Sequence, residues 1–155
     1  SGRSAASAEF RALVGSLLDA SPVPPYKLCF ELTETASIDR LSEACAFIDT
    51  VRERGCRVAL DDFGSGLSSF AYLKNLPVDI LKIDGIFVRD MLSHPLDLAV
   101  VRAVVSVARS LGKRTIAEWA ESEDVLQRLR EIGVDAAQGF AIHRPCPIEE
   151  FFVAS

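Results

Sequence analysis

Hydrophobic and polar positions along the chain follow two alternating patterns. Short runs of apolar and β-branched residues, typical of buried strands, are each followed by a longer stretch with apolar residues at helical spacing. Strands are predicted at residues 27–32, 57–61, 80–84, 114–118 and 136–138, and helices at about 38–54, 68–75, 96–111 and 123–131. Strands that alternate with helices pair in parallel through right-handed crossovers, so the sequence predicts an α/β fold.

Two α/β architectures fit this order of elements: an open doubly wound sheet and a section of a (β/α)8 barrel. In an open sheet the ligand contacts gather at one switch point, whereas in a barrel several successive strands deliver functional groups from their carboxyl ends. All five predicted strands end in or beside polar side chains, namely Glu31, Glu34, Asp61, Asp62, Lys82, Asp84, Glu118, Glu121 and Gln138. The pattern therefore favours a partial (β/α)8 TIM-type barrel of five parallel strands with crossover helices.

The length of the chain adds to this picture. Complete barrels of this type have about 250 residues and eight strands, whereas this chain has 155 residues. We therefore expect a fragment, a single domain over residues 1–155 whose two unpaired edge strands must be covered or paired with another copy. Residues 1–8 are expected to be disordered or extraneous to the domain, and they are given no functional weight.

Composition limits the class of protein and its partners. The chain carries 22 acidic and 17 basic side chains, a net charge of -5, whereas binders of polymeric DNA or RNA usually present a basic face. The longest apolar stretch, residues 96–111, is interrupted by Asp97, Arg102 and Arg109, so no membrane-spanning helix is predicted. Four scattered cysteines are interpreted as reduced and mostly buried. We expect a cytoplasmic domain that does not bind DNA or RNA polymers.

The strongest local signal is the run Asp61-Asp62-Phe63-Gly64-Ser65-Gly66. Adjacent carboxylates at a strand end can bind one or two hard cations, since Mg²⁺ and Mn²⁺ prefer carboxylate and water ligands. Taken alone, the same residues fit equally well a solvated turn that caps a helix.

The neighbouring strand ends favour the metal site. Glu31 and Glu34 end the strand before this run, and Lys82 and Glu118 end the two strands after it. Several acids at one opening repel one another unless cations are bound, so a metal-dependent site is predicted. Two metal ions would stabilise both the attacking and the leaving oxygens of a phosphodiester, and Lys82 would orient the attacking water or help deprotonate it.

Five ordered strings carry a resemblance to a known family. These are Phe30-Glu31-Leu32-Thr33-Glu34, Asp61-Asp62-Phe63-Gly64-Ser65-Gly66 with Leu67-Ser68-Ser69, Leu81-Lys82-Ile83-Asp84, Ala117-Glu118 and Gln138-Gly139-Phe140. In order and separation they resemble the EAL family of bacterial cyclic-di-GMP phosphodiesterases, over about residues 13–152. The resemblance implies hydrolysis of cyclic di-GMP to linear pGpG with two Mg²⁺ or Mn²⁺ ions. It also implies a homodimer, and a parent protein that can carry sensory, diguanylate-cyclase-like or membrane-anchoring segments.

The same resemblance assigns roles to individual residues. The implied metal ligands are Glu31, Asp61, Asp62 and Glu118, with Asp61 bridging the two ions. In the catalytic set, Lys82 would hold the nucleophilic water beside Glu118, and Glu34 would tie down the loop after Asp62. Gln138 would support the site at the last strand.

Two further residues are candidates for substrate binding, each with a structural alternative. Asp84 shares a strand face with Lys82 but would equally cap the helix after Gly85. Glu121 lies three residues beyond Glu118, yet it belongs to a charged segment typical of a solvated helix start. His94 and His143 are interpreted as surface histidines, without a carboxylate at ligand spacing.

The sequence also departs from the family pattern. The Glu-Ala-Leu tripeptide and a metal-binding Asn belong to strands that this chain does not contain, so the resemblance implies two missing ligands and an impaired isolated chain. Trp119 and Ala120 replace the usual Gly and Val, which would narrow the opening or add a stacking surface for guanine. Ser65 in place of Thr and Phe140 in place of Tyr are mild changes.

Two other functions stay open beside the enzyme. A receptor would bind the dinucleotide without cutting it, and a purely structural module would only self-associate. The complete set Glu31, Asp61, Asp62, Lys82 and Glu118 favours the enzyme, because a receptor would typically have lost some of it.

Overall fold

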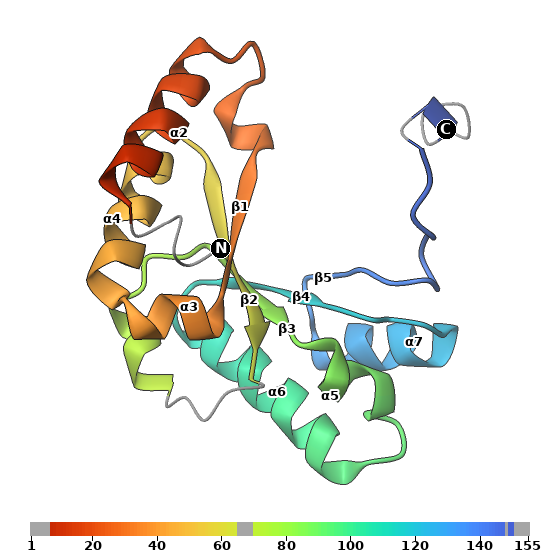
Figure 1. The fold of residues 1–155 in the computed structure, drawn as a ribbon. Helices are drawn as coiled ribbons and strands as arrows, with labels where there is room; N and C mark the ends of the chain where they lie inside the picture. The colour runs from red at the N-terminus through yellow and green to blue at the C-terminus, as the bar shows by residue number, and fades with distance from the viewer. Residues whose placement is uncertain (1–6, 65–69, 148, 151–155) are drawn as a thin grey trace.

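The computed structural model of the chain describes residues 7–64, 70–147 and 149–150. One five-stranded sheet is formed by β1 (Cys29–Thr33), β2 (Arg57–Phe63), β3 (Ile80–Ile83), β4 (Arg114–Ala117) and β5 (Ala136–Ala137). Neighbouring strands are parallel, and their order in the sheet is their order in the chain (Figure 1). A sequential order without reversal is that of a barrel wall, which confirms the predicted α/β fold and its barrel-like architecture.

Helical elements precede the sheet and connect its strands. Before β1 lie α2 (Ala8–Ala20) and the short 3-10 helix η1 (Pro25–Lys27). Between successive strands lie α3 (Glu34–Asp39) and α4 (Leu41–Arg52), then η2 (Phe70–Lys74), then α5 (Gly85–Asp90) and α6 (Pro95–Ser110), and finally α7 (Glu123–Ile132). The predicted strands agree with these bounds to within two residues at each end, which is the usual uncertainty of element ends.

The helix α2 was not predicted from the sequence. The hydroxyl of Ser7 caps its first turn, so the expected disorder of residues 7 and 8 is wrong. Its apolar pattern is weak, because Val14 is buried while Leu13 and Leu17 are exposed. A helix that buries so little apolar surface leaves only a faint periodic signal.

Two predicted helices differ in the structure. The helix expected over 38–54 is interrupted at Arg40, whose backbone leaves the helical region and separates α3 from α4. The helix expected over 68–75 is the 3-10 element η2 at residues 70–74, and its predicted first residues lie outside the described ones.

The hydrophobic core lies between the helices and one face of the sheet. Val58 and Leu60 of β2 and Leu81 of β3 are fully buried on that face. On this side α4 packs against β2, and α6 packs against β3 and β4. Burial of these apolar side chains supplies most of the stabilisation of the fold.

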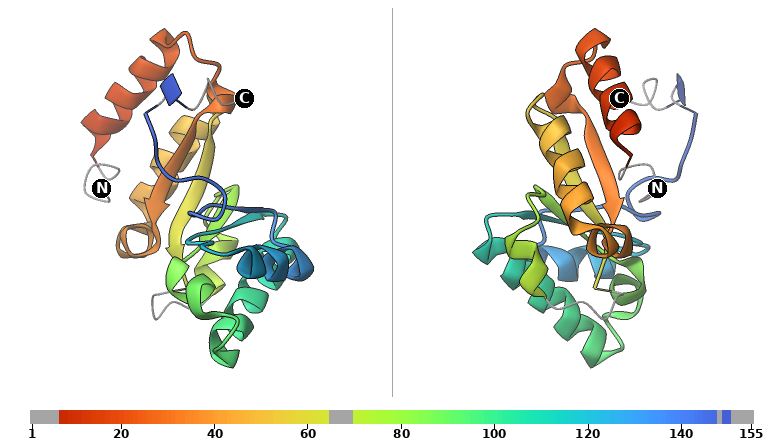
Figure 2. Two further views of the ribbon diagram at one scale, coloured as in Figure 1. Left: turned by 90° about the vertical axis from the view of Figure 1, so that its right-hand side faces the viewer. Right: turned by 60° about the vertical axis from the view of Figure 1, so that its left-hand side comes forward.

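The other face of the sheet carries the polar residues. In β1 the side chains of Cys29, Glu31 and Thr33 alternate with core residues and are exposed. The strand direction turns from the steep β1 to β4, which runs across the view in Figure 1, and the turned views in Figure 2 show the same change of direction, as a twisted barrel wall requires. Functional groups on this face are therefore held by a rigid sheet rather than by loops alone.

The cysteines correct one expectation. All four are free thiols, but only Cys56 is buried, while Cys29 is exposed on the polar face of the edge strand and Cys45 and Cys146 are half-buried. The prediction that they are mostly buried is therefore wrong. Among the helices of the described residues, none combines the length and apolar character needed to cross a bilayer.

Candidate functional site

The side chain of Lys82 lies at the centre of the predicted site. Its Nζ atom is 2.7 Å from Asp61 Oδ1, 2.8 Å from Glu118 Oε1 and 3.0 Å from Glu31 Oε2. Glu31 belongs to β1, Asp61 to β2 and Lys82 to β3. Glu118 directly follows β4, so four consecutive strands each contribute one side chain. We call Glu31, Asp61, Asp62, Lys82 and Glu118 the carboxylate cluster.

Strand register explains how residues far apart in sequence meet. Leu81 pairs with the buried Leu60, so the next residue, Lys82, points to the opposite, polar face. Lys82 in turn pairs with Ile116, and Glu118 lies two residues further along the same face. Parallel pairing thus places these side chains at one carboxyl edge of the sheet.

A β-bulge explains how two adjacent aspartates can share a site. In the pairing of β2 with β3, Leu60 is opposite Leu81 and Phe63 is opposite Ile83, so β2 has one extra residue between them. Leu60 and Phe63 both remain buried. Asp62 lies in this bulge, and its φ of 56° is in the left-handed region, which is uncommon outside glycine. The irregular backbone keeps both aspartates beside Glu118.

Like charges dominate the electrostatics of the carboxylate cluster. Burial raises the pKa of the Glu118 carboxyl above its ordinary value, and the opposing effect of Lys82 does not cancel this. Burial, together with the charges of Asp61 and Asp84, also raises the pKa of Asp62. Four carboxylates share one ammonium group, so the cluster attracts further positive charge.

The surroundings of Lys82 favour its charged form, whereas those of Glu118 and Asp62 favour the neutral acids. Burial alone would lower the pKa of its ammonium group, but the close contacts with the carboxylates of Asp61, Glu118 and Glu31 outweigh burial and raise that pKa above its usual value. Lys82 is therefore a cation at neutral pH in the metal-free cluster.

The donor set fits a divalent cation. Asp61, Asp62 and Glu118 each offer a carboxylate oxygen, and these oxygens all lie within 4.8 Å of one another. Asp61 Oδ1 is buried and accepts no hydrogen bond of good geometry from the described residues, although Lys82 Nζ is 2.7 Å away. Clustered oxygen donors with excess negative charge are those that Mg²⁺ and Mn²⁺ prefer.

Glu34 makes a separate set of contacts. It is buried at the start of α3, where Oε2 accepts a hydrogen bond from the Gly64 amide at 3.2 Å and Oε1 accepts one from the Tyr72 hydroxyl at 2.7 Å. Its carboxylate therefore joins α3, the segment after Asp62 and η2. Ser65 and Gly66 of the same motif lie outside the described residues. The supporting role predicted for Glu34 stays a prediction that agrees with these contacts.

Tyr72 is a residue whose part in this network the sequence analysis missed. Its hydroxyl donates a hydrogen bond to the buried carboxylate of Glu34, which lies 38 residues away in sequence. Burial is the main cause that raises the pKa of Tyr72 above its ordinary value, and this hydrogen bond is the second. The only available signal was a phenol, which needs a polar partner when buried, close to a Gly-rich turn.

Gln138 reaches the carboxylate cluster from β5. Its Nε2 donates to Glu118 Oε1 at 3.0 Å, and its backbone accepts a hydrogen bond from the Ala120 amide. A Cβ on the following Gly139 would overlap the backbone of Ala120, so only glycine permits this close approach. The support predicted for Gln138 from the last strand stays a prediction, and this hydrogen bond to a cluster residue agrees with it.

The remaining two candidates lie less centrally. Asp84 caps α5, with its carboxylate accepting from the Ile86 amide at 3.0 Å, which is the structural alternative foreseen for it. Glu121 is exposed, just before the Ser122 cap of α7. Roles of both in substrate binding stay predictions.

His94 corrects another expectation. Ligand atoms of Asp90, His94 and Asp97 lie within 4.8 Å of one another, so His94 does have carboxylates at ligand spacing. Asp90 ends α5, His94 precedes α6 and Asp97 lies in the first turn of α6, so the turn between the two helices brings them together. All are at least partly exposed, and Asp90 is already paired with Arg89 at 2.8 Å.

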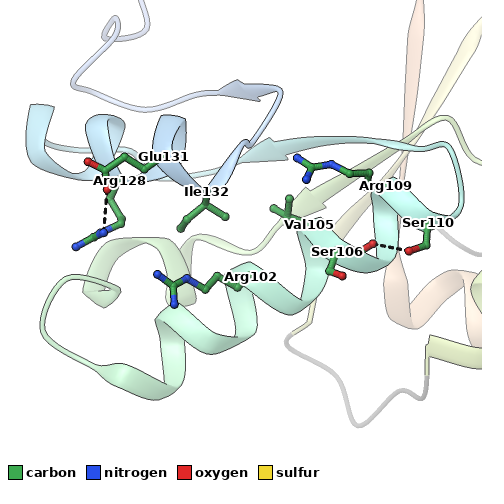
Figure 3. Close-up of a pocket in the computed structure, with 8 residues that line it drawn as sticks. All are labelled: Arg102, Val105, Ser106, Arg109, Ser110, Arg128, Glu131 and Ile132. Atoms are coloured by element: carbon green, nitrogen blue, oxygen red, sulfur yellow. Dashed lines mark hydrogen bonds and ion pairs between the residues drawn. The ribbon is translucent and has the colours of Figure 1, made fainter.

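A groove of about 460 Å³ lies elsewhere, between α6 and α7 (Figure 3). Arg102 and Arg109 of α6 face Arg128 and Glu131 of α7 across Val105 and Ile132. Arg128 is paired with Glu131 at 2.8 Å. None of the predicted site residues lines this groove.

Comparison with known proteins identifies the relatives of this fold and site. The model of the EAL domain family matches residues 1–145. The cyclic di-GMP phosphodiesterase PdeB of Shewanella oneidensis is 41% identical over 129 residues, which are 83% of this chain and 15% of that protein. The solved structure of the PaMucR phosphodiesterase in complex with c-di-GMP superposes with a TM-score of 0.91 at 32% identity, covering 97% of this chain and 61% of the other.

A second solved structure supports the same assignment. The EAL domain of Mycobacterium smegmatis DcpA has a TM-score of 0.86 at 34% identity, over 96% of this chain and 66% of its own. The 155 residues thus span less than two thirds of each of these relatives. Because the family model covers most of the chain, this chain belongs to the EAL domain family.

Proposed function

We propose that the chain is the carboxyl-terminal part of an EAL domain that hydrolyses cyclic di-GMP to linear pGpG. The related proteins that carry the name cyclic di-GMP phosphodiesterase support this substrate and reaction. The observation that carries the proposal is the carboxylate cluster, in which the Lys82 ammonium lies within 3.0 Å of carboxylates from three other strands.

The proposed reaction needs divalent metal ions, for which we favour two Mg²⁺ or Mn²⁺. Glu31, Asp61, Asp62 and Glu118 would hold them. Ions bound there would stabilise the attacking and leaving oxygens of the phosphodiester. The spacing of the Asp61, Asp62 and Glu118 oxygens supports this ligand set.

The protein side chains would then have separate tasks. Lys82 would donate a hydrogen bond to the attacking water, whose oxygen forms the new bond to phosphorus as the bond to the ribose oxygen breaks. Gln138 would fix the orientation of Glu118 through the hydrogen bond that it already makes. Glu34 would hold the segment after Asp62, and Asp84 and Glu121 would contribute to substrate binding.

The proposal extends to partners and location. The carboxylate cluster is open along the edge strand β1, where half of the Glu31 side chain is exposed. Because of this exposed edge, we propose that a homodimer or further strands of the parent domain complete the site, and that the 155 residues alone are impaired. Four free thiols favour the cytoplasm as its compartment.

The test is incubation of cyclic di-GMP with the full 155-residue chain and Mn²⁺, followed by chromatography. Formation of pGpG by the wild-type chain but not by Glu118→Gln would support catalysis at the carboxylate cluster. Equal turnover by both would contradict it. Binding without turnover would favour the receptor alternative, and no binding would reject both functions for this chain.

A further inference from the structure

Trp119 is an exposed aromatic residue beside the carboxylate cluster, and the proposed mechanism assigns it no task. It directly follows Glu118 at the carboxyl end of β4, and 47% of its surface is exposed. Among the large apolar side chains exposed in the described residues, it is the one adjacent in sequence to a cluster residue. Its position, rather than its exposure alone, makes it a candidate binding contact, because an aromatic ring offers a flat apolar surface beside the charged cluster.

The backbone of Trp119 is strained in a way that places this ring. Its φ of 51° lies in the left-handed region, where a large side chain is rarely found. Among the described residues other than glycine, only Asp62 shares a positive φ, and Asp62 belongs to the carboxylate cluster. Strain of this kind persists mainly where it positions a functional group.

Gly85 provides the surface on which the indole ring rests. A Cβ built on Gly85 would overlap Trp119 at Cγ and Cδ2, and would lie 2.8 Å from Cδ1, so one face of the pyrrole ring lies directly on the glycine. Gly85 directly follows Asp84, whose negative charge is one cause of the raised pKa of Asp62. One face of the indole is therefore covered by Gly85. The exposed surface of the side chain belongs to its other face and its edge.

We propose that Trp119 binds the substrate by stacking on one of its guanine bases while the carboxylate cluster takes the phosphodiester. The inference rests on the proposed function and deepens it, because it assigns a residue to the base. Aromatic side chains are suited to this task, since every nucleobase presents a flat π-face. A rigid ring that is already seated on Gly85 loses little conformational freedom on binding.

The test compares binding of cyclic di-GMP by the full chain and three variants, with and without Mn²⁺. Affinity is measured by equilibrium dialysis, with the ligand checked by chromatography for breakdown. Trp119→Ala should weaken binding about 10-fold, a typical value for loss of one stacked base. Trp119→Phe should restore most of the affinity. Tyr26→Ala, which removes a more exposed aromatic residue from η1, before the amino end of β1, should have no effect.

Two further readouts separate stacking from a merely structural role. Trp119 is the single tryptophan of the chain, so its fluorescence should be quenched by cyclic di-GMP with the same midpoint as the dialysis curve. Gly85→Ala should displace the indole without removing it and should weaken binding as Trp119→Ala does. Thermal unfolding of each variant checks that it remains folded.

Each outcome decides the inference. Dialysis binding by the wild type with unchanged tryptophan fluorescence, or with unchanged affinity in Trp119→Ala, would overturn stacking and leave the proposed function standing. Tighter binding by Trp119→Ala would show that the ring narrows the opening instead. Absence of binding by the wild type would overturn this inference and would reject catalysis and ligand binding by the 155 residues alone.

Discussion

Strands β1 and β3 both contribute to the carboxylate cluster, but they do so in very different surroundings. All four residues of β3 are buried, and the Lys82 side chain is only 4% exposed. In β1 three of five residues are exposed, and the Glu31 side chain is 50% exposed. The exposed fraction of the three carboxylate partners of Lys82 thus increases, from 11% for the Glu118 side chain through 22% for Asp61 to 50% for Glu31.

This gradient shows that one ion network can contain contacts of very different energetic weight. A buried ammonium that loses its partners, or buried carboxylates that lose their ammonium, bear a large desolvation penalty. An exposed carboxylate is already solvated and screened, so its ion pair contributes little. The centre of the sheet should therefore govern stability, while the edge strand should tolerate change.

The largest expected effect comes from the central charge. Lys82→Met leaves carboxylates of Asp61 and Glu118 without a counter-charge, so we expect the free energy of unfolding at pH 7 to fall by about 3–5 kcal/mol. The loss should shrink as the pH falls, because raised pKa values let the folded state take up protons first, which stabilises it at low pH. Urea unfolding at pH 5 and 7 measures this.

The control for that variant is added metal. Divalent cations should restore part of the lost stability if the carboxylates form the proposed binding site. A loss below about 1 kcal/mol at pH 7 would show that water solvates the carboxylate cluster and would remove the contrast between β3 and β1.

A matched pair of truncations compares the two ends of the gradient. Glu118→Ala removes a buried partner of Lys82 and of Gln138 and should cost about 1–3 kcal/mol. Glu31→Ala removes the exposed partner of the same ammonium and should cost less than about 1 kcal/mol. Chemical denaturation of both variants in one buffer measures the difference, and equal costs would refute the gradient.

A third prediction concerns the buried hydrogen bond beside the cluster. Tyr72→Phe leaves Oε1 of the buried Glu34 carboxylate without its hydroxyl donor, while the Gly64 amide still donates to Oε2, and should cost about 1.5–3 kcal/mol at pH 7. Since the pKa of Tyr72 is raised in the folded state, the tyrosine's contribution is present below pH ~10 and is lost as the pH rises above that value. Unfolding curves at pH 7 and pH 11 should therefore lie further apart for the wild type than for the variant.

The smallest effect is expected at the periphery. Asp19 of α2 pairs with Arg54 at 2.8 Å, and the Asp19 side chain is 61% exposed. Asp19→Asn should lower the stability less than any substitution above, because the pair is solvated, and about 1 M salt should abolish the difference. A cost as large as that of Glu118→Ala would mean that α2 depends on this ion pair rather than on its apolar contacts.

Much of the fold was readable from the sequence, because its signals are local and repeated. Apolar runs of strand length alternate with helical periodicity, and turn residues separate them. Charged residues recur at strand ends such as Asp61, Lys82 and Glu118, and parallel strands place such ends at one edge. The cluster residues could therefore be predicted to meet, although their distances could not.

Other features had no local signal. The helix α2 buries little apolar surface, and the break at Arg40 depends on how α3 and α4 pack. The partner of Tyr72 lies 38 residues away in sequence, and the carboxylates near His94 become neighbours only through the turns of the chain. Such contacts depend on where separate elements come to rest, which periodicity does not specify.

The sequence by itself determined the α/β class, the order of the strands and the side chains at their carboxyl ends. Only the tertiary structure decided which charges are buried, because burial depends on neighbouring strands rather than on the residue itself. It also decided that a bulge brings two adjacent aspartates to one face and that Trp119 rests on Gly85. Backbone register and close packing set these arrangements, and both arise only when the whole sheet is assembled.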